Sequence, residues 1–126
     1  HSSYREDIKQ LGWVSQEDLN YLVNAAEVFV FPSLYEGFGL PILESFASGT
    51  PVVTSVGHSA EEVGEDAAIY VNPENPEEIA NEVLSFLTNT ELREKYIENG
   101  FLRLEDFSWE KAGKQTVAAL LGEGKA

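Results

Sequence analysis

Short apolar runs of β-prone residues constrain this fold more than any other feature of the sequence. The clearest run is Val-Phe-Val-Phe at residues 28–31, which a Pro-Ser pair ends. A continuous apolar run, without alternating polar residues, is typical of a strand buried on both faces of a parallel sheet. Residues 51–54 and 67–71 fit the same description. A fourth apolar segment, residues 8–14, is a possible additional strand.

Helical segments separate these runs. Ser15, with Asp18 three residues later, predicts one helix start, and Asn75 followed by proline predicts another. Trp109 is expected to anchor the last helix in the core. Further helices are expected over residues 41–48, around residues 60–63, and after caps at Thr90 and Ser108. Because strands alternate with helices throughout, the sequence predicts an α/β fold with a parallel sheet.

Charge and cysteine content exclude several classes of partner and site. Twenty-two acidic residues against eight basic ones give a formal net charge of −14, which argues against nucleic acid and anionic membrane surfaces as partners. No lysine or arginine lies between Lys9 and Arg93, so a phosphate bound in this stretch would be held without a cationic side chain. The chain has no cysteine, which favours a reducing compartment, and we expect a cytoplasmic location. No apolar run approaches the roughly 20 residues of a transmembrane helix, so none is expected.

The ends of the sequence suggest part of a longer protein. The chain contains no methionine and begins with His-Ser-Ser. Residues 1–7 are therefore interpreted as a tag remnant or fragment end, and residues 123–126 as a tail. Residues 8–122 are expected to form a single incomplete domain.

Residues 32–44 carry the most chemical information. The segment begins at the carboxyl end of a predicted buried strand and finishes inside a helix, which is where ligands bind in open α/β sheets. Gly37 and Gly39 allow a sharp turn and a close approach of a ligand. The amides of Phe38, Gly39 and Leu40 lie at the expected helix start, where they lack intrahelical partners and can donate to an anion or to sugar hydroxyls.

Two glutamates bracket this row of donors. Glu36 precedes the turn, and Glu44 lies about one turn into the helix. A carboxylate accepts two hydrogen bonds from a vicinal diol, while amides donate to phosphate oxygens. This order suits a nucleotide-diphosphate sugar, which has a diol at each end and a diphosphate between. The alternative is a glycine loop with a solvent-exposed glutamate on each side, and Gly-x-Gly alone does not decide between the two.

Residues 36–44, Glu-Gly-Phe-Gly-Leu-Pro-Ile-Leu-Glu, resemble the Glu-(seven residues)-Glu motif of retaining glycosyltransferases of the GT-B fold, of the group 1 type. That family includes many bacterial mannosyl- and glucosyltransferases. The resemblance covers residues 8–122 and implies a partial Rossmann-like parallel sheet with flanking helices, the C-terminal part of such an enzyme. It continues in Leu-Gly-Trp-Val-Ser (11–15), Phe-Val-Phe-Pro-Ser (29–33), Ala-Ser-Gly-Thr-Pro-Val-Val (47–53) and Glu-Val-Gly-Glu-Asp-Ala-Ala (62–68).

The resemblance also implies roles for the residues of the motif. Glu36 would contact hydroxyls of the donor sugar and is the candidate catalytic residue, while Glu44 would hold the ribose hydroxyls. The amides of residues 37–40 would hold sugar hydroxyls and the distal phosphate. The family transfers sugar with retained anomeric configuration and usually without a metal, and the sequence contains no Asp-x-Asp pair or histidine cluster that suggests a metal site.

The implied function is the donor-binding part of an enzyme that transfers a hexose from a nucleotide-diphosphate sugar to an acceptor. In the family, an arginine and a lysine that precede residue 8 bind the diphosphate, and an N-terminal domain binds the acceptor. Without that charge stabilisation the chain alone is expected to be inactive. The alternative is a non-catalytic α/β module that uses the same loop to bind a nucleotide or a partner protein.

An incomplete sheet also has consequences for association. If the preceding strands are missing, residues 28–31 form an open apolar edge, and such an edge invites pairing with another chain. Two arrangements are open: residues 8–14 cover this edge within one chain, or two copies meet edge to edge. We expect some self-association.

Overall fold

A parallel sheet forms the centre of the structure, a computed structural model that describes residues 3–122. Its three strands are β1 (Phe29–Phe31), β2 (Val52–Ser55) and β3 (Ala68–Val71), in the order β1-β2-β3. In the register, Val52 of β2 pairs with Phe29 of β1 and Ala68 of β3. The predicted α/β class with a parallel sheet is confirmed. The first two residues and the predicted tail at 123–126 lie outside the described residues.

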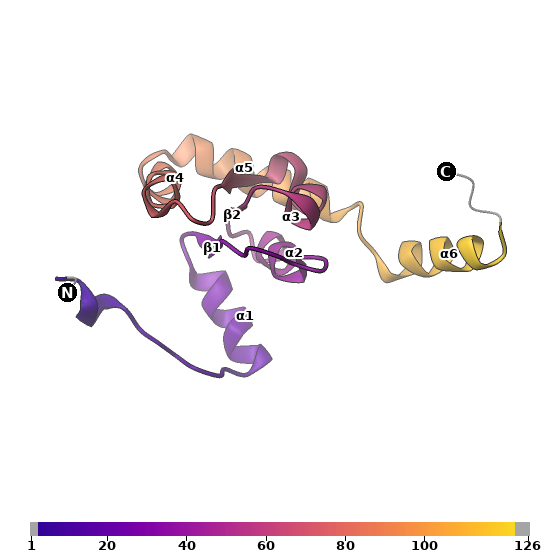
Figure 1. Ribbon diagram of the computed structural model, residues 1–126, viewed down its shortest axis with the longest axis horizontal. Helices are drawn as coiled ribbons and strands as arrows, with labels where there is room; N and C mark the ends of the chain where they lie inside the picture. Colours follow the sequence, from indigo (N-terminus) through magenta and orange to yellow (C-terminus); the bar gives the residue numbers. More distant parts are fainter. Residues whose placement is uncertain (1–2, 123–126) are drawn as a thin grey trace.

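Helices flank the sheet on both sides (Figure 1). Helix α2 lies on one side, and α4 and the start of α5 lie on the other. No helix among residues 3–122 is long and apolar enough to cross a membrane. The helices are α1 (Gln16–Ala25), α2 (Leu40–Ala47), α3 (His58–Gly64), α4 (Pro76–Thr88), α5 (Thr90–Leu104) and α6 (Trp109–Leu120), with short 3₁₀ turns η1 (Arg5–Asp7) and η2 (Glu65–Ala67).

Side-chain caps begin three of the six α-helices at the residues that the sequence predicts. The Ser15 hydroxyl accepts from the Asp18 amide (3.1 Å), and the side chains of Asn75 and Ser108 cap α4 and α6 in the same way. The predicted cap at Thr90 is wrong by one residue. The Asn89 side chain accepts from the Leu92 amide (3.0 Å) and caps α5, because Asn89 also ends α4 in an extended conformation.

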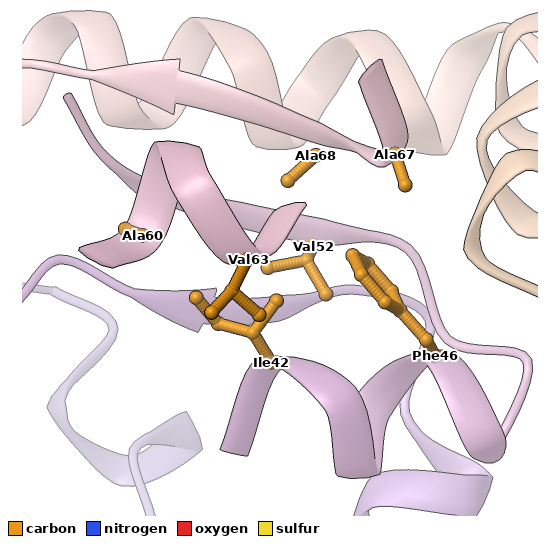
Figure 2. Packing of buried hydrophobic residues seen from close by; sticks show 7 residues of the cluster. All are labelled: Ile42, Phe46, Val52, Ala60, Val63, Ala67 and Ala68. Atoms are coloured by element: carbon orange, nitrogen blue, oxygen red, sulfur yellow. The ribbon is translucent and has the colours of Figure 1, made fainter. Parts of the chain in front are cut away.

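The core lies on both faces of β2, whose Val52 and Val53 are 0% exposed. On one face, Ile42 and Phe46 rise from α2 toward Val52, and α3 and the alanines around the start of β3 close this cluster (Figure 2). On the other face, Val53 and Val71 pack against Phe86 of α4. The partly buried residues that pack against this cluster are Val28, Ile69, Ile79, Val83, Leu92 and Tyr96.

The structure corrects two predictions about strands. Residues 8–14 form no strand, and Trp13 within them is 90% exposed, because this segment runs away from the sheet and has no neighbour to pair with (Figure 1). β1 is not buried on both faces: Phe29 and Phe31 are half-buried and Val30 is 38% exposed. In the described part of the chain, β1 pairs with β2 alone, so its outer edge is open.

Helix α6 lies apart from the sheet and its helices (Figure 1). It buries none of its residues, and Trp109 at its start is 88% exposed. The prediction that Trp109 anchors this helix in the core is therefore wrong. Within residues 3–122 no other element packs over α6, so its apolar side chains stay exposed.

Arg103 of α5 fixes the carboxyl end of α3. Its Nε donates to the carbonyl oxygen of Val63 (2.9 Å), and an Nη donates to that of Glu62 (2.7 Å). The guanidinium also pairs with Glu65 (3.1 Å) and Asp106 (2.8 Å), and its side chain is 12% exposed. Carbonyl groups at a helix end lack intrahelical partners, so Arg103 satisfies groups that would otherwise need water.

Arg103→Lys is expected to lower the free energy of unfolding by about 1.5–3 kcal/mol, because an ammonium lacks the planar fork that reaches both carbonyl groups. Urea unfolding followed by circular dichroism measures this difference. Lys114→Ala is the control, since it breaks an exposed pair with Glu110 (2.7 Å) that is worth about 0.3–0.5 kcal/mol. Equal losses in the two variants would contradict the assigned role of Arg103.

Two helical glycines give a second test of the packing. A Cβ at Gly100 of α5 would lie 3.0 Å from Cδ1 of Phe46, whose side chain is buried in the core. Overpacking then exceeds the gain in helix propensity, and Gly100→Ala is expected to lower the free energy of unfolding by about 1 kcal/mol. At Gly113 of α6 a Cβ meets nothing within 4 Å, so Gly113→Ala is the matched control and should cause no loss. A Gly100→Ala variant as stable as the parent would refute this close packing.

Candidate functional site

The segment that joins β1 to α2 begins at the carboxyl end of β1, as the sequence predicts. Gly39 is the N-cap of α2 and has φ +92°, a left-handed conformation that favours glycine. A Cβ at Gly39 would also lie 3.3 Å from Cδ1 of Ile42. Gly37 differs, because its φ is not positive and a Cβ there would meet nothing within 4 Å. The turn itself therefore requires a glycine at position 39. At position 37, neither the backbone conformation nor a close neighbour requires one.

The predicted row of amide donors is present at the start of α2. Within residues 3–122, the amides of Phe38, Gly39 and Leu40 donate to no protein group, whereas the Ile42 amide donates to the Gly39 carbonyl oxygen (3.0 Å). Phe38 and Leu40 are about half exposed. These amides can therefore donate to a ligand that lies against the helix start.

The two glutamates lie on either side of this turn. Glu36 is half-buried in the loop, and Glu44 is exposed in the second turn of α2. Glu44 follows Leu40 by four residues, so the two share the outer face of the helix, while Ile42, Ser45 and Phe46 face the core. Neither carboxylate forms an ion pair within the described chain.

The end of β2 and the start of α3 lie beside the loop that carries Glu36. The Ser59 hydroxyl donates to the Glu36 carbonyl oxygen (2.9 Å), and the Ser55 hydroxyl donates to the Ser33 carbonyl oxygen. The crevice between the two segments has a volume of about 20 Å³, enough for a single water molecule. A sugar would therefore lie over this crevice and not inside it. Sequence reasoning missed Ser59, and its one signal was a serine in the turn that follows a predicted strand.

A larger apolar groove lies on the other side of the helix start, with a volume of about 230 Å³. The Phe38 ring meets the Phe107 ring edge-on, with the ring centroids 6.1 Å apart. Phe38 of the motif thus contacts the connection between α5 and α6, which the sequence did not indicate. The lining residues are Phe38, Leu40, Leu43, Phe107, Ser108, Trp109 and Ala112.

Tyr70 of β3 lies beside the carboxyl end of α3, among acidic side chains. Burial raises the pKa of Tyr70 in β3 well above its ordinary value, and the negative charge of Glu61 raises it further. The Tyr70 hydroxyl donates to the Glu65 carbonyl oxygen (2.8 Å) and stays protonated. Among residues 3–122, no group of three or more histidine, aspartate and glutamate side chains is placed to hold a metal ion.

Comparison with known proteins shows which family the chain is similar to. The family described as "Glycosyl transferases group 1" matches residues 2–103. The chain is 44% identical over 112 residues to "O-antigen chain mannosyltransferase B" of Escherichia coli, a match that covers 89% of the chain and 29% of that protein. It is 41% identical over 109 residues to "MMP alpha-(1->4)-mannosyltransferase" of Mycolicibacterium hassiacum, covering 83% of the chain and 26% of that protein.

An uncharacterized glycosyltransferase of Methanocaldococcus jannaschii is 39% identical over 116 residues, covering 90% of the chain and 30% of that protein. The chain therefore spans less than a third of the length of these relatives. The family match covers well over half of the chain and includes the motif at residues 36–44 and the three strands of the sheet. The chain belongs to the glycosyl transferases group 1 family.

Proposed function

We propose that this chain is the donor-binding part of a retaining glycosyltransferase that transfers a hexose from a nucleotide-diphosphate sugar to an acceptor. Mannose is the first sugar to test, because two of the relatives named above are mannosyltransferases. The proposal rests above all on the loop between β1 and α2. There the unpartnered amides of a helix start lie between two carboxylates that form no ion pair in the described chain.

Each part of the loop has a role in this proposal. Glu36 accepts hydrogen bonds from hydroxyls of the donor sugar and is the catalytic candidate. The amides of residues 37–40 donate to sugar hydroxyls and to the distal phosphate, where the helix dipole favours negative charge. Glu44 accepts from the two ribose hydroxyls. Gly37 supports this arrangement, because the turn does not require a glycine there and a side chain would stand in the ligand's path.

The proposed site lacks cationic side chains of its own. No lysine or arginine lies in residues 10–92, which contain the loop and the three strands. A leaving diphosphate needs positive charge in the transition state, and amides alone supply little of it. We therefore propose that cationic side chains of the longer protein, outside this 126-residue chain, bind the diphosphate.

The proposed whole protein is a longer polypeptide with an additional acceptor-binding domain. The relatives, more than three times as long as the part they share with this chain, support this view. We further propose that transfer needs no metal ion, since the sequence carries no Asp-x-Asp pair, and that the protein acts in the cytoplasm, in keeping with its lack of cysteine.

The direct test is sugar transfer by the longer protein that contains this chain. Release of nucleoside diphosphate from GDP-mannose and UDP-glucose is expected in that protein but not in the 126-residue chain, which lacks the proposed cations. Calorimetry with the same compounds should show binding to the chain alone that is weaker than about 1 mM. Micromolar binding by the chain alone would show that it neutralises the diphosphate unaided. Binding without any release in the longer protein would favour a non-catalytic module.

The two glutamates are expected to have separable effects in the longer protein. Glu44→Ala should weaken the affinity for free nucleoside diphosphate, because a lost hydrogen bond to a charged group costs about 1.5–3 kcal/mol. Glu36→Ala should reduce turnover by a similar free energy and leave the nucleoside diphosphate affinity nearly unchanged, because this carboxylate faces the sugar. Calorimetry with nucleoside diphosphates and steady-state kinetics with nucleotide sugars measure the two effects.

Glu94→Ala is the control for both variants, since Glu94 is an exposed acid in the middle of α5. It removes one negative charge outside the loop, so the affinity for nucleoside diphosphate and the turnover should both stay at the parental value. Equal loss of nucleoside diphosphate affinity in the Glu36 and Glu44 variants would refute the division of roles.

A further inference from the structure

Few contacts hold the loop that carries Glu36. Leu34 and Tyr35 are exposed, at 75% and 81%. Within residues 3–122, one ring contact and one hydrogen bond reach residues 34–38 from other elements. The ring contact joins Phe38 to the connection after α5. The hydrogen bond runs from the Ser59 hydroxyl to the Glu36 carbonyl oxygen (2.9 Å). The backbone at Glu36 thus depends on Ser59.

Ser59 completes a series of hydroxyl groups that bind the backbone leading out of β1. Thr54 Oγ1 donates to the carbonyl oxygen of Phe31 at the end of β1 (2.9 Å), and Ser55 Oγ donates to that of Ser33. Ser59 makes the same type of bond further along, at Glu36. The first two bonds hold the strand end, so Ser59 alone in this series acts on the part of the loop proposed to contact ligand.

The support beneath Ser59 is rigid. Ala60 and Val63 of α3 are buried in the core at 6% and 2% exposure, and Arg103 binds the carboxyl end of the helix. Loss of the Ser59 hydroxyl would leave these contacts in place. It would therefore release the loop without displacing α3.

We propose that Ser59 is a positioning residue for the donor-sugar site. By holding the Glu36 carbonyl oxygen, it sets where the Glu36 carboxylate stands relative to the amides of residues 37–40. Small displacements of a group that contacts the reacting sugar lower the rate steeply, which is why such groups need a fixed support. Ser59 makes its hydrogen bond to the backbone of Glu36 and none to Glu44. Because Glu36 is proposed to contact the sugar, Ser59 acts on the sugar end of the ligand. This inference rests on the proposed function.

The loop itself can be tested in the 126-residue chain by NMR relaxation. In Ser59→Ala, the amide order parameters of Glu36 and Gly37 should fall from about 0.85 to below about 0.6. Ser59→Thr keeps the hydroxyl and should restore the parental values. Ser85→Ala is the matched control, because it removes a part-buried hydroxyl that donates to a carbonyl oxygen within α4 (2.7 Å). Unchanged order parameters in Ser59→Ala would overturn the proposal.

The effect on the reaction is measured in the longer protein. Ser59→Ala should lower the rate of nucleoside diphosphate release from GDP-mannose or UDP-glucose by roughly 2- to 12-fold, the ratio that one net hydrogen bond represents. The affinity for GDP or UDP should change less than the rate does, and Ser59→Thr should restore the rate. An equal loss of rate and affinity, or the same loss in Ser85→Ala, would overturn the proposal. If the parental protein released nothing, the proposed function would fail, while the order parameters would still decide whether Ser59 holds the loop.

Discussion

Burial of β2 on both faces is the constraint on which the rest of the structure depends. Val52 and Val53 point to opposite sides and are both 0% exposed, so each needs a layer of helices over it. Helices α2 and α3 cover Val52, and α4 with the start of α5 covers Val53. Parallel pairing with β1 and β3 then brings the carboxyl ends of all three strands to one edge. The proposed donor site lies at that edge because this packing places the loops there.

The same strand that fills the core also organises the loop beside it. Thr54 and Ser55 at the end of β2, and Ser59 at the start of α3, carry hydroxyl groups that bind carbonyl oxygens of the neighbouring segment. A glycine loop with exposed aromatic residues has little apolar area of its own to bury, so hydrogen bonds from a fixed neighbour are what can order it. Core packing and site geometry are linked in this way through a few hydroxyl groups.

Several surfaces of the chain remain open. The outer edge of β1 has no partner in the described residues, and Trp13 and Trp109 are almost fully exposed. Residues 10–92, which include the loop, contain no lysine or arginine and so supply no cationic side chain for a diphosphate. These features fit the proposal that the chain works within a longer transferase. Self-association through the edge of β1 stays a prediction, since an open apolar edge can also pair with a second copy.

The sequence by itself determined what depends on near neighbours. The helix starts at Ser15, Asn75 and Ser108 follow from side chains that bond amides three residues on, and the turn at Gly39 follows from its backbone freedom. The cap at Asn89 was missed by one residue because its position depends on where the preceding helix ends.

Tertiary structure alone decided what depends on distant partners. The apolar side chains of residues 8–14 and the ring of Trp109 stay largely exposed, because burial requires a second surface and no described element packs over them. The bond from Ser59 to Glu36 joins positions 23 residues apart, and no local pattern encodes it. It exists because parallel pairing of β1 and β2 places the turns that follow them side by side.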